Sequence, residues 1–309
     1  MTAHDTSPVR IGLVGGGDPR RLETIDGLDS LWVGGHVASR NPSPEAMMGL
    51  ARVAALTERV QIGTSILLLP LYPPALVAKQ VADLDRATNG RIILGVGIGG
   101  EYPQEFRACE IPIEERGPRT NEIIPLLRKL WTAEPITHEG RFYSMEDVRI
   151  HPAPVQPAGP PIVVAGRQEP AMRRAARLGD GWFPYLYSPR RYAASVEIVK
   201  EAAANAGRDL SAFGWYVFVF VSVDPDGDAA REQAARSMGG TYNQDFRAMV
   251  DSVAAAGTVR EVTEKIQAFY DAGARHIVFS PATAGADPQP VVDRLFGEVV
   301  PALREYTRQ

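Results

Sequence analysis

The sequence contains a single cysteine, Cys109, in 309 residues. One thiol cannot form an internal disulfide, and it cannot supply the paired cysteines of a structural zinc site. No apolar stretch reaches the ~18 residues that a membrane-spanning helix needs, and the first ten residues lack a basic segment followed by an apolar one. We therefore expect a cytoplasmic protein without a membrane partner.

Concentrated positive charge is also missing. The formal net charge is −4 at pH 7, and basic residues stand together at most in pairs, as at Arg173 and Arg174. A nucleic-acid-binding surface needs a basic patch, so we expect a small-molecule partner and no nucleic acid. His138, His151 and His276 are too dispersed to share one element, and no metal site is predicted.

What the sequence does contain is a series of short apolar segments in a chain that is 45% hydrophobic. Several are apolar at every position, which is typical of parallel strands that are covered on both faces. Eight such strands are predicted, over residues 9–14, 28–34, 60–69, 91–97, 161–166, 180–186, 214–223 and 276–280.

Helical patterns separate these strands, and no linker-like break interrupts the alternation. We therefore predict one α/β domain over residues 1–309, a (β/α)8 TIM barrel. Two stretches exceed a simple barrel. Residues 134–160 read as a strand pair with a proline-rich crossing after strand four, and residues 224–257 form a polar insertion after strand seven. We expect both insertions at the mouth of the barrel, where lids are built.

The segment RIILGVGIGGEY, residues 91–102, contains Gly95, Gly97 and Gly100 in the spacing of a dinucleotide-binding turn. That motif must open a helix directly, and an acidic residue must end the next strand ~20 residues later. Pro103 and Pro112 interrupt any long helix here, and the turn follows the fourth strand. We interpret the glycines as the end of a barrel strand that approaches a flat ligand.

Several segments together resemble the bacterial luciferase-like superfamily, whose members are barrels that use FMN or the deazaflavin coenzyme F420. The similarity covers nearly the whole chain. It depends on the order and spacing of DSLWVGGH (29–36), QIGTSILLLPLYPPALVAKQVADLDRATNGRIILGVGIGG (61–100), ERGPRTNEIIPLLRKLW (115–131), GRFY (140–143), PPIVVAG (160–166) and RRAARLGDGW (173–182).

The resemblance implies a catalytic role for His36, just past strand two. A histidine at the matching place in deazaflavin enzymes contacts the reactive ring and exchanges a proton with the substrate, which suits a group that titrates near neutrality. The alternative is a histidine that only caps a strand end. Gly35 departs from the pattern, because several deazaflavin dehydrogenases carry aspartate there.

The resemblance also implies how a cofactor would be held. A bulge at Ser65 and Ile66, often a cis peptide in the family, would support the ring; the alternative is a plain strand. Backbone atoms would form a wall at Gly97, Ile98, Gly99 and Gly100. The phosphate end would lie at a helix N-terminus near residue 170, where free amides favour an anion. The residues assigned to that end are Gly166, Arg167, Gln168, Glu169 and Arg174.

Substrate contacts are predicted at Glu101, Trp182 and Tyr185, with Tyr187 a further candidate. The alternatives are a solvent-facing carboxylate and aromatic packing under loops. Sugar-phosphate dehydrogenases of the family carry a catalytic glutamate where this chain has Gly100, so that activity is not transferred. Alternating aromatic residues at 216, 218 and 220 are assigned to the core.

The function that follows is hydride transfer between coenzyme F420 and a small organic substrate. One alternative is an FMN-dependent two-component monooxygenase that receives reduced flavin from a separate reductase. Another is a barrel that binds a flavin without turnover. Apolar helices after strands two and three, together with the resemblance, lead us to expect a homodimer.

Overall fold

The computed structural model describes residues 9–15, 17–39 and 42–307. The start of the N-terminal segment considered above for a targeting signal, residues 1–8, lies outside the described residues. None of the described helices is long and apolar enough to cross a bilayer.

Eight parallel strands form a closed barrel, as the sequence predicts. The ring closes because β10 pairs with β9 on one side and with β12 on the other. Neighbouring strands are covered on both faces, which explains why their sequences are apolar throughout. In ring order the strands are β1 (Arg10–Val14), β2 (Ser30–Val33), β3 (Gln61–Thr64), β5 (Ile92–Gly97), β8 (Ile162–Ala165), β9 (Gly181–Phe183), β10 (Gly214–Val223) and β12 (His276–Pro281).

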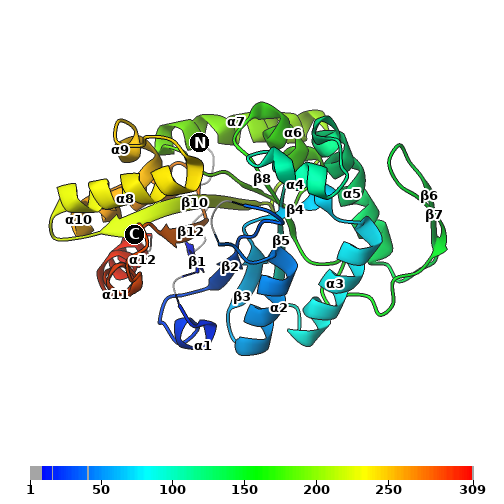
Figure 1. Ribbon diagram of the computed structural model, residues 1–309, viewed down its shortest axis with the longest axis horizontal. Helices are drawn as coiled ribbons and strands as arrows, with labels where there is room; N and C mark the ends of the chain where they lie inside the picture. Colours follow the sequence, from blue (N-terminus) through cyan, green and yellow to red (C-terminus); the bar gives the residue numbers. More distant parts are fainter. Residues whose placement is uncertain (1–8, 16, 40–41, 308–309) are drawn as a thin grey trace.

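Helices surround this barrel and cover its outer face (Figure 1). The main core lies between the two layers, and it is built from the outward side chains of the strands and the apolar stripes of the helices. The helices of this layer are α1 (Pro19–Leu22), α2 (Ala46–Leu56), α3 (Pro74–Ala87), α5 (Arg116–Leu130), α6 (Glu169–Leu178), α7 (Pro189–Asn205), α10 (Val259–Asp271), α11 (Gln289–Arg294) and α12 (Val300–Tyr306).

The predicted third strand, residues 60–69, is divided in two. After β3 the chain passes through a cis peptide between Ser65 and Ile66, and β4 (Leu67–Leu68) then pairs with β5. A short 3-10 turn, Leu69–Leu71, leads into α3. After β5, the short helix α4 (Pro103–Ala108) and the 3-10 turn Ile113–Glu115 precede α5.

Both insertions are present, at opposite ends of the long axis of the molecule (Figure 1). The first forms the antiparallel hairpin of β6 (Ile136–Glu139) and β7 (Ser144–Val148). The second forms α8 (Gly227–Tyr242), α9 (Val250–Val253) and β11 (Ala254–Gly257), and β11 pairs with β10 outside the ring.

The inside of the barrel is filled by a plug of side chains centred on Trp32. Its ring fits because Gly63 carries no Cβ, which would lie 2.6 Å from the indole carbons. The Trp32 Nε1–H donates to Ser30 Oγ (2.8 Å), which also bonds His276 Nε2 (2.7 Å). Tyr216 stacks on the buried His276. Burial, followed by the positive charge of Arg10, lowers the pKa of His276 to about 3. This plug fills the middle of the barrel, so a ligand cavity must lie toward one end of it.

Candidate functional site

A cavity of about 620 Å³ lies at the carboxyl end of the barrel. Its lining includes the last residue of five of the eight barrel strands, namely Val14, Val33, Gly97, Ala165 and Phe183. The carboxyl ends of the strands are where barrel enzymes place their chemistry, because the loops that follow can vary without disturbing the core. The cavity is therefore the candidate active site.

His36 lines this cavity, as predicted, and a buried carboxylate holds it in place. Its Nδ1 lies 3.0 Å from Glu105 Oε1, and its ring is nearly perpendicular to that of Tyr102, with 5.0 Å between the ring centroids. The Glu105 side chain, on α4, is 1% exposed, whereas that of His36 is 27% exposed. Sequence reasoning missed Glu105. Nothing in the surrounding sequence distinguishes it from the nearby Glu101, and only the fold brings it to His36.

Ser65 and Ile66 also line the cavity. The Ile66 side chain occupies the space in front of Gly97, where a Cβ would lie 1.9 Å from Ile66 Cδ1. Ser65 Oγ is buried and has no hydrogen-bond partner among the described residues. A buried hydroxyl without a partner is costly, so Ser65 Oγ is suited to bond a ligand that enters the cavity.

The wall of residues 97–100 is present, and all four residues line the cavity. Gly99 and Gly100 have φ values of 63° and 116°, in the left-handed region that favours glycine. On the outer side of Gly100 lies Arg116, whose Nε is buried and has no partner among the described residues.

Of the residues predicted for a phosphate, only Gly166 lines the cavity. Gln168 is the N-cap residue of α6, and Glu169 pairs with Arg173 at the surface. The Arg167 guanidinium lies 5.0 Å from the centre of the Tyr185 ring. The N-terminus of α6 is thus next to the cavity, but the side chains of Arg167, Gln168 and Glu169 are not part of its lining.

Arg174 lies on α6, packed against the first turns of α5, and is 8% exposed. Its Nε–H donates to Asn121 Oδ1 at 2.6 Å, and its Nη2–H donates to the Gly117 carbonyl at 3.4 Å. Burial lowers its pKa. Both partners are neutral, and within the described ranges no carboxylate pairs with Arg174. A buried cation with neutral partners favours an anion nearby.

Trp182 does not line the cavity, and its prediction as a substrate contact is wrong. Side chains alternate along β9, so Trp182 faces the outer helices, where it stacks on Tyr192, while Phe183 faces inward. The Trp182 Nε1–H instead donates to the Gly166 carbonyl at 2.9 Å. Tyr187 is likewise buried away from the cavity.

Aromatic residues nevertheless form much of the cavity. Tyr185 lines it, as predicted, and its hydroxyl donates to Glu101 Oε1 at 2.9 Å. Phe218 and Phe220 belong to the core, as predicted, and they also line the cavity, whereas Tyr216 lies deeper, in the plug. The strand β10 therefore passes from the plug to the cavity wall along its inward face.

The insertion after β10 contributes to the cavity, as predicted. Thr241 and Tyr242, at the end of α8, both line it. The Tyr242 ring stacks on Tyr185 at 6.2 Å, and the Tyr102 hydroxyl donates to the Thr241 carbonyl at 3.2 Å. The end of α8 thus meets the loop after β5 across the cavity.

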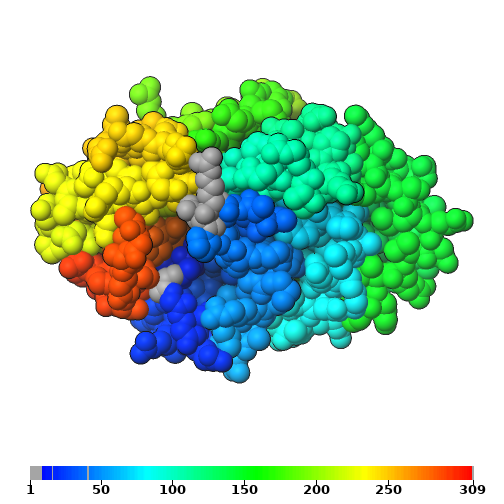
Figure 2. Space-filling model, in the orientation of Figure 1, coloured from blue at the N-terminus to red at the C-terminus, as the bar shows by residue number. Residues whose placement is uncertain are grey.

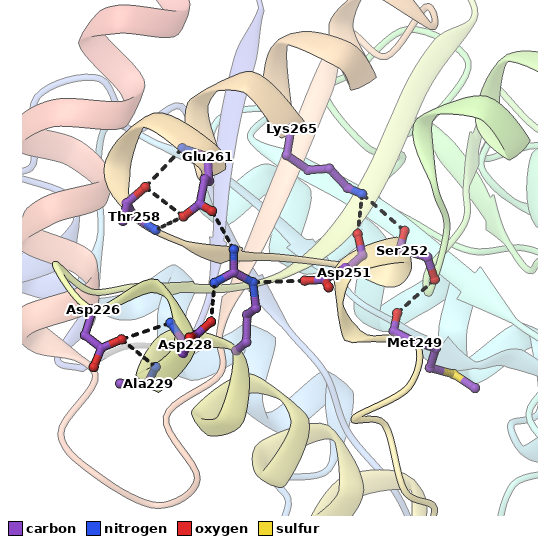
Figure 3. Close-up of polar contacts among 10 residues, drawn as sticks. Asp226, Asp228, Ala229, Met249, Asp251, Ser252, Thr258, Glu261 and Lys265 are labelled. Atoms are coloured by element: carbon purple, nitrogen blue, oxygen red, sulfur yellow. Dashed lines mark hydrogen bonds and ion pairs between the residues drawn. The ribbon is translucent and has the colours of Figure 1, made fainter.

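A cluster of charges ties the start of this insertion to the barrel. Arg231 on α8 contacts Asp228, Asp251 and Glu261 at 3.1, 3.1 and 2.5 Å. Figure 3 shows the three carboxylates converging from α8, α9 and α10. Glu261 also forms a capping box with Thr258 at the start of α10. These contacts fix the base of α8, whose other end reaches the cavity.

The hairpin β6–β7 is not a lid, and that expectation is wrong. Residues 134–160 contribute nothing to the cavity lining, and the hairpin forms the end of the molecule opposite α8 and α10 (Figures 1 and 2). Glu122 on α5 anchors it by accepting hydrogen bonds from His138 Nε2 (3.2 Å) and from the backbone N–H groups of Phe142 and Tyr143.

No cluster of three or more histidine, cysteine or acidic side chains suited to a metal ion occurs in the part of the chain that the structure describes.

Comparison with known proteins places this cavity in a family. The model of the luciferase-like monooxygenases matches residues 21–276. The chain belongs to this luciferase-like family. It is 29% identical to the F420-dependent glucose-6-phosphate dehydrogenase of Gordonia bronchialis, over 94% of this chain and 95% of that one. It is 31% identical to the enzyme of the same name from Amycolatopsis mediterranei, over 92% of each chain.

A solved structure supports the fold of this luciferase-like chain. It is an F420-dependent secondary alcohol dehydrogenase in complex with an F420-acetone adduct, with a TM-score of 0.84 and 22% identity. The superposition covers 96% of this chain and 99% of that one. The predicted family and barrel are thus confirmed.

Proposed function

We propose that this protein is a coenzyme F420-dependent oxidoreductase that acts on a small organic alcohol or carbonyl compound. The observation that carries the proposal is that His36, the Ser65–Ile66 bulge and the wall of residues 97–100 line one cavity. Full-length relatives named as F420-dependent dehydrogenases favour the deazaflavin over FMN.

The residues present fit such a cofactor. Gly99 and Gly100 carry no side chains where a flat ring would approach the backbone of this wall, and the buried Ser65 Oγ offers an unused hydrogen-bonding group in the same cavity. The buried Nε of Arg116 lies 3.2 Å from the place that a Cβ on Gly100 would occupy, and Arg174 bonds the carbonyl of the neighbouring Gly117. Both cations favour a phosphate-bearing tail nearby. We assign the ring to the bulge and glycine wall, and the anionic end to the region of Gly166 and α6.

When bound, F420 supplies the acceptor or donor of a hydride. The protein must orient the substrate and move its proton. His36 is the titratable group placed for the proton, because it lines the cavity while its other nitrogen is held by Glu105. In alcohol oxidation His36 Nε2 accepts the hydroxyl proton as the carbonyl forms, and in reduction it returns that proton. Tyr185 and Glu101 form part of the substrate wall.

Activity toward glucose 6-phosphate is not part of this proposal, although several relatives are named for that activity. Glu101 and Glu105 place two carboxylates around the cavity, and a phosphate dianion close to them would be repelled. Among the described residues that line the cavity, Arg52 is the only lysine or arginine that could offset this repulsion. We therefore favour an uncharged substrate.

A parallel titration of the apoprotein with F420 and with FMN tests the function. We expect saturable quenching of F420 fluorescence at a concentration at least tenfold below that needed for FMN. Preference for FMN, above all in its reduced form, would overturn the F420 assignment in favour of a two-component monooxygenase. Binding of F420 without turnover across a panel of alcohols and ketones would support a non-catalytic barrel.

We also propose a homodimer formed through α2 and α3. Met48 on α2 is 69% exposed and Leu76 on α3 is 49% exposed, which leaves large apolar side chains uncovered on the helices that follow strands two and three. Light scattering at micromolar concentration should give twice the mass of one chain, and a monomer mass would reject the proposal.

A further inference from the structure

The carboxylate that holds His36 is itself fully engaged. Oε1 of Glu105 meets His36 Nδ1, while Oε2 accepts the backbone N–H groups of Val37 (2.8 Å) and Ala38 (3.3 Å). Three consecutive residues after β2 are thus bound by one side chain of α4. The Glu105 side chain is 1% exposed, so water does not compete for these bonds.

These contacts determine which nitrogen of His36 carries a proton. Oε2 faces two N–H donors, so it must act as an acceptor, and an ionised carboxylate can only accept at Oε1 as well. With Glu105 ionised, the hydrogen bond at 3.0 Å requires a proton on Nδ1. In the neutral imidazole the other nitrogen, Nε2, is then bare, and no described residue bonds it.

We propose that Glu105 is the positioning residue of the active site: it holds the proton of His36 on Nδ1 and leaves Nε2 as the base that faces the cavity. The role given to Nε2 in substrate chemistry rests on the proposed function. The protonation of the ring does not, because it follows from protein contacts alone.

The other titratable groups near His36 and Glu105 do not compete with Glu105 for the Nδ1 proton. Behind it, burial, followed by the negative charge of Glu105, raises the pKa of the Cys109 thiol. Burial, followed by a hydrogen bond to Glu45, raises the pKa of Tyr72. Both groups are therefore neutral near pH 7. On the cavity side, Tyr102 presents its ring to His36, and the carboxylate of Glu101 bonds Tyr185.

The substitution Glu105→Gln should reverse the protonation of the ring. The amides of Val37 and Ala38 still need an oxygen, so the new side-chain carbonyl must occupy the Oε2 position. The new NH2 group is then forced toward His36 Nδ1 and donates to it. His36 must accept at Nδ1 and carry its proton on Nε2, where it can no longer act as a base.

Long-range ¹H–¹⁵N NMR of apoprotein labelled in histidine measures this directly, since protonated and bare ring nitrogens differ in ¹⁵N shift. His36→Ala identifies the signals of His36. We expect Nδ1–H with bare Nε2 in the wild type, and the reverse in Glu105→Gln. An Nε2–H form in the wild type would overturn the proposal even if the variant failed to fold, and so would an unchanged form in a folded variant.

Glu122→Gln is the matched control, because Glu122 also bonds one histidine and two consecutive backbone amides. It should alter the signals of His138 alone and leave turnover unchanged.

With F420 and an accepted alcohol, Glu105→Gln should lower kcat by about 10²–10⁴-fold, with KM and F420 affinity changing less than threefold. A fall in kcat accompanied by an equally large rise in KM and an equally large fall in F420 affinity would show that Glu105 only supports the fold. Failure of F420 to bind would reject the proposed function and leave the NMR result standing.

Discussion

Two glutamates in this protein each bond one histidine ring nitrogen and two consecutive backbone amides, in different places. Glu105 bonds His36 Nδ1 and the amides of Val37 and Ala38, at the carboxyl end of the barrel. Glu122 bonds His138 Nε2 and the amides at 142 and 143, on the outer flank. One group of contacts borders the cavity and the other fastens a hairpin. The same local chemistry therefore becomes functional or structural according to its position on the barrel.

The largest effect should come from removing the histidine at the cavity. His36→Ala should lower turnover by about 10²–10⁴-fold, because it removes the group that exchanges the substrate proton. F420 affinity, measured by fluorescence quenching, should stay within about threefold, since the ring is held by backbone atoms. His138→Ala should leave turnover unchanged. Equal losses of binding and turnover in His36→Ala would contradict the assignment.

A third histidine, which bonds no carboxylate among the described residues, extends the comparison to stability. His276 is buried against Ser30, and its pKa is lowered from 6.5 to about 3. The unfolded chain binds this proton more readily, so the stabilising effect is complete above about pH 6.5 and is lost as the pH falls toward 3. The loss should approach about 1.4 kcal/mol per pH unit. Urea unfolding between pH 7 and 5 should show a smaller slope with pH for His276→Gln, and identical slopes would reject this origin.

The smallest effect should come from the outer glutamate. Glu122→Ala leaves two backbone amides and His138 without their acceptor, at a half-buried site. We expect the free energy of unfolding to fall by about 1–2 kcal/mol, with faster amide hydrogen exchange in the hairpin β6–β7. Turnover should not change. A loss of activity in a folded Glu122→Ala variant would remove the distinction between the two glutamates.

The barrel could be predicted because its signals are local. Apolar runs locate all eight strands, and the lengths between them leave little choice of topology. The break at Ser65 could be suggested only by resemblance, because a cis peptide that lacks proline has no compositional signature. Trp182 was assigned wrongly since β9 is only three residues long, too short for alternation to show which side chain faces inward.

The partner of His36 could not be predicted at all. Glu101 and Glu105 lie four residues apart, and one is exposed while the other is fully buried. That difference arises from how α4 packs beneath the segment after β2, a contact across 69 residues of sequence. Long-range contacts of this kind depend on tertiary packing, which composition and periodicity do not encode.

The cluster around Arg231 has a consequence for how this enzyme could be altered. It fastens a single contiguous insertion, residues 224–257, to the barrel at the end remote from the cavity, while Thr241 and Tyr242 form part of the cavity wall at the other end. The glycine wall and His36 belong to other segments. Substrate selectivity can therefore change by replacement of this one insertion, residues 224–257. The residues proposed to hold the cofactor and to move the proton would stay unchanged.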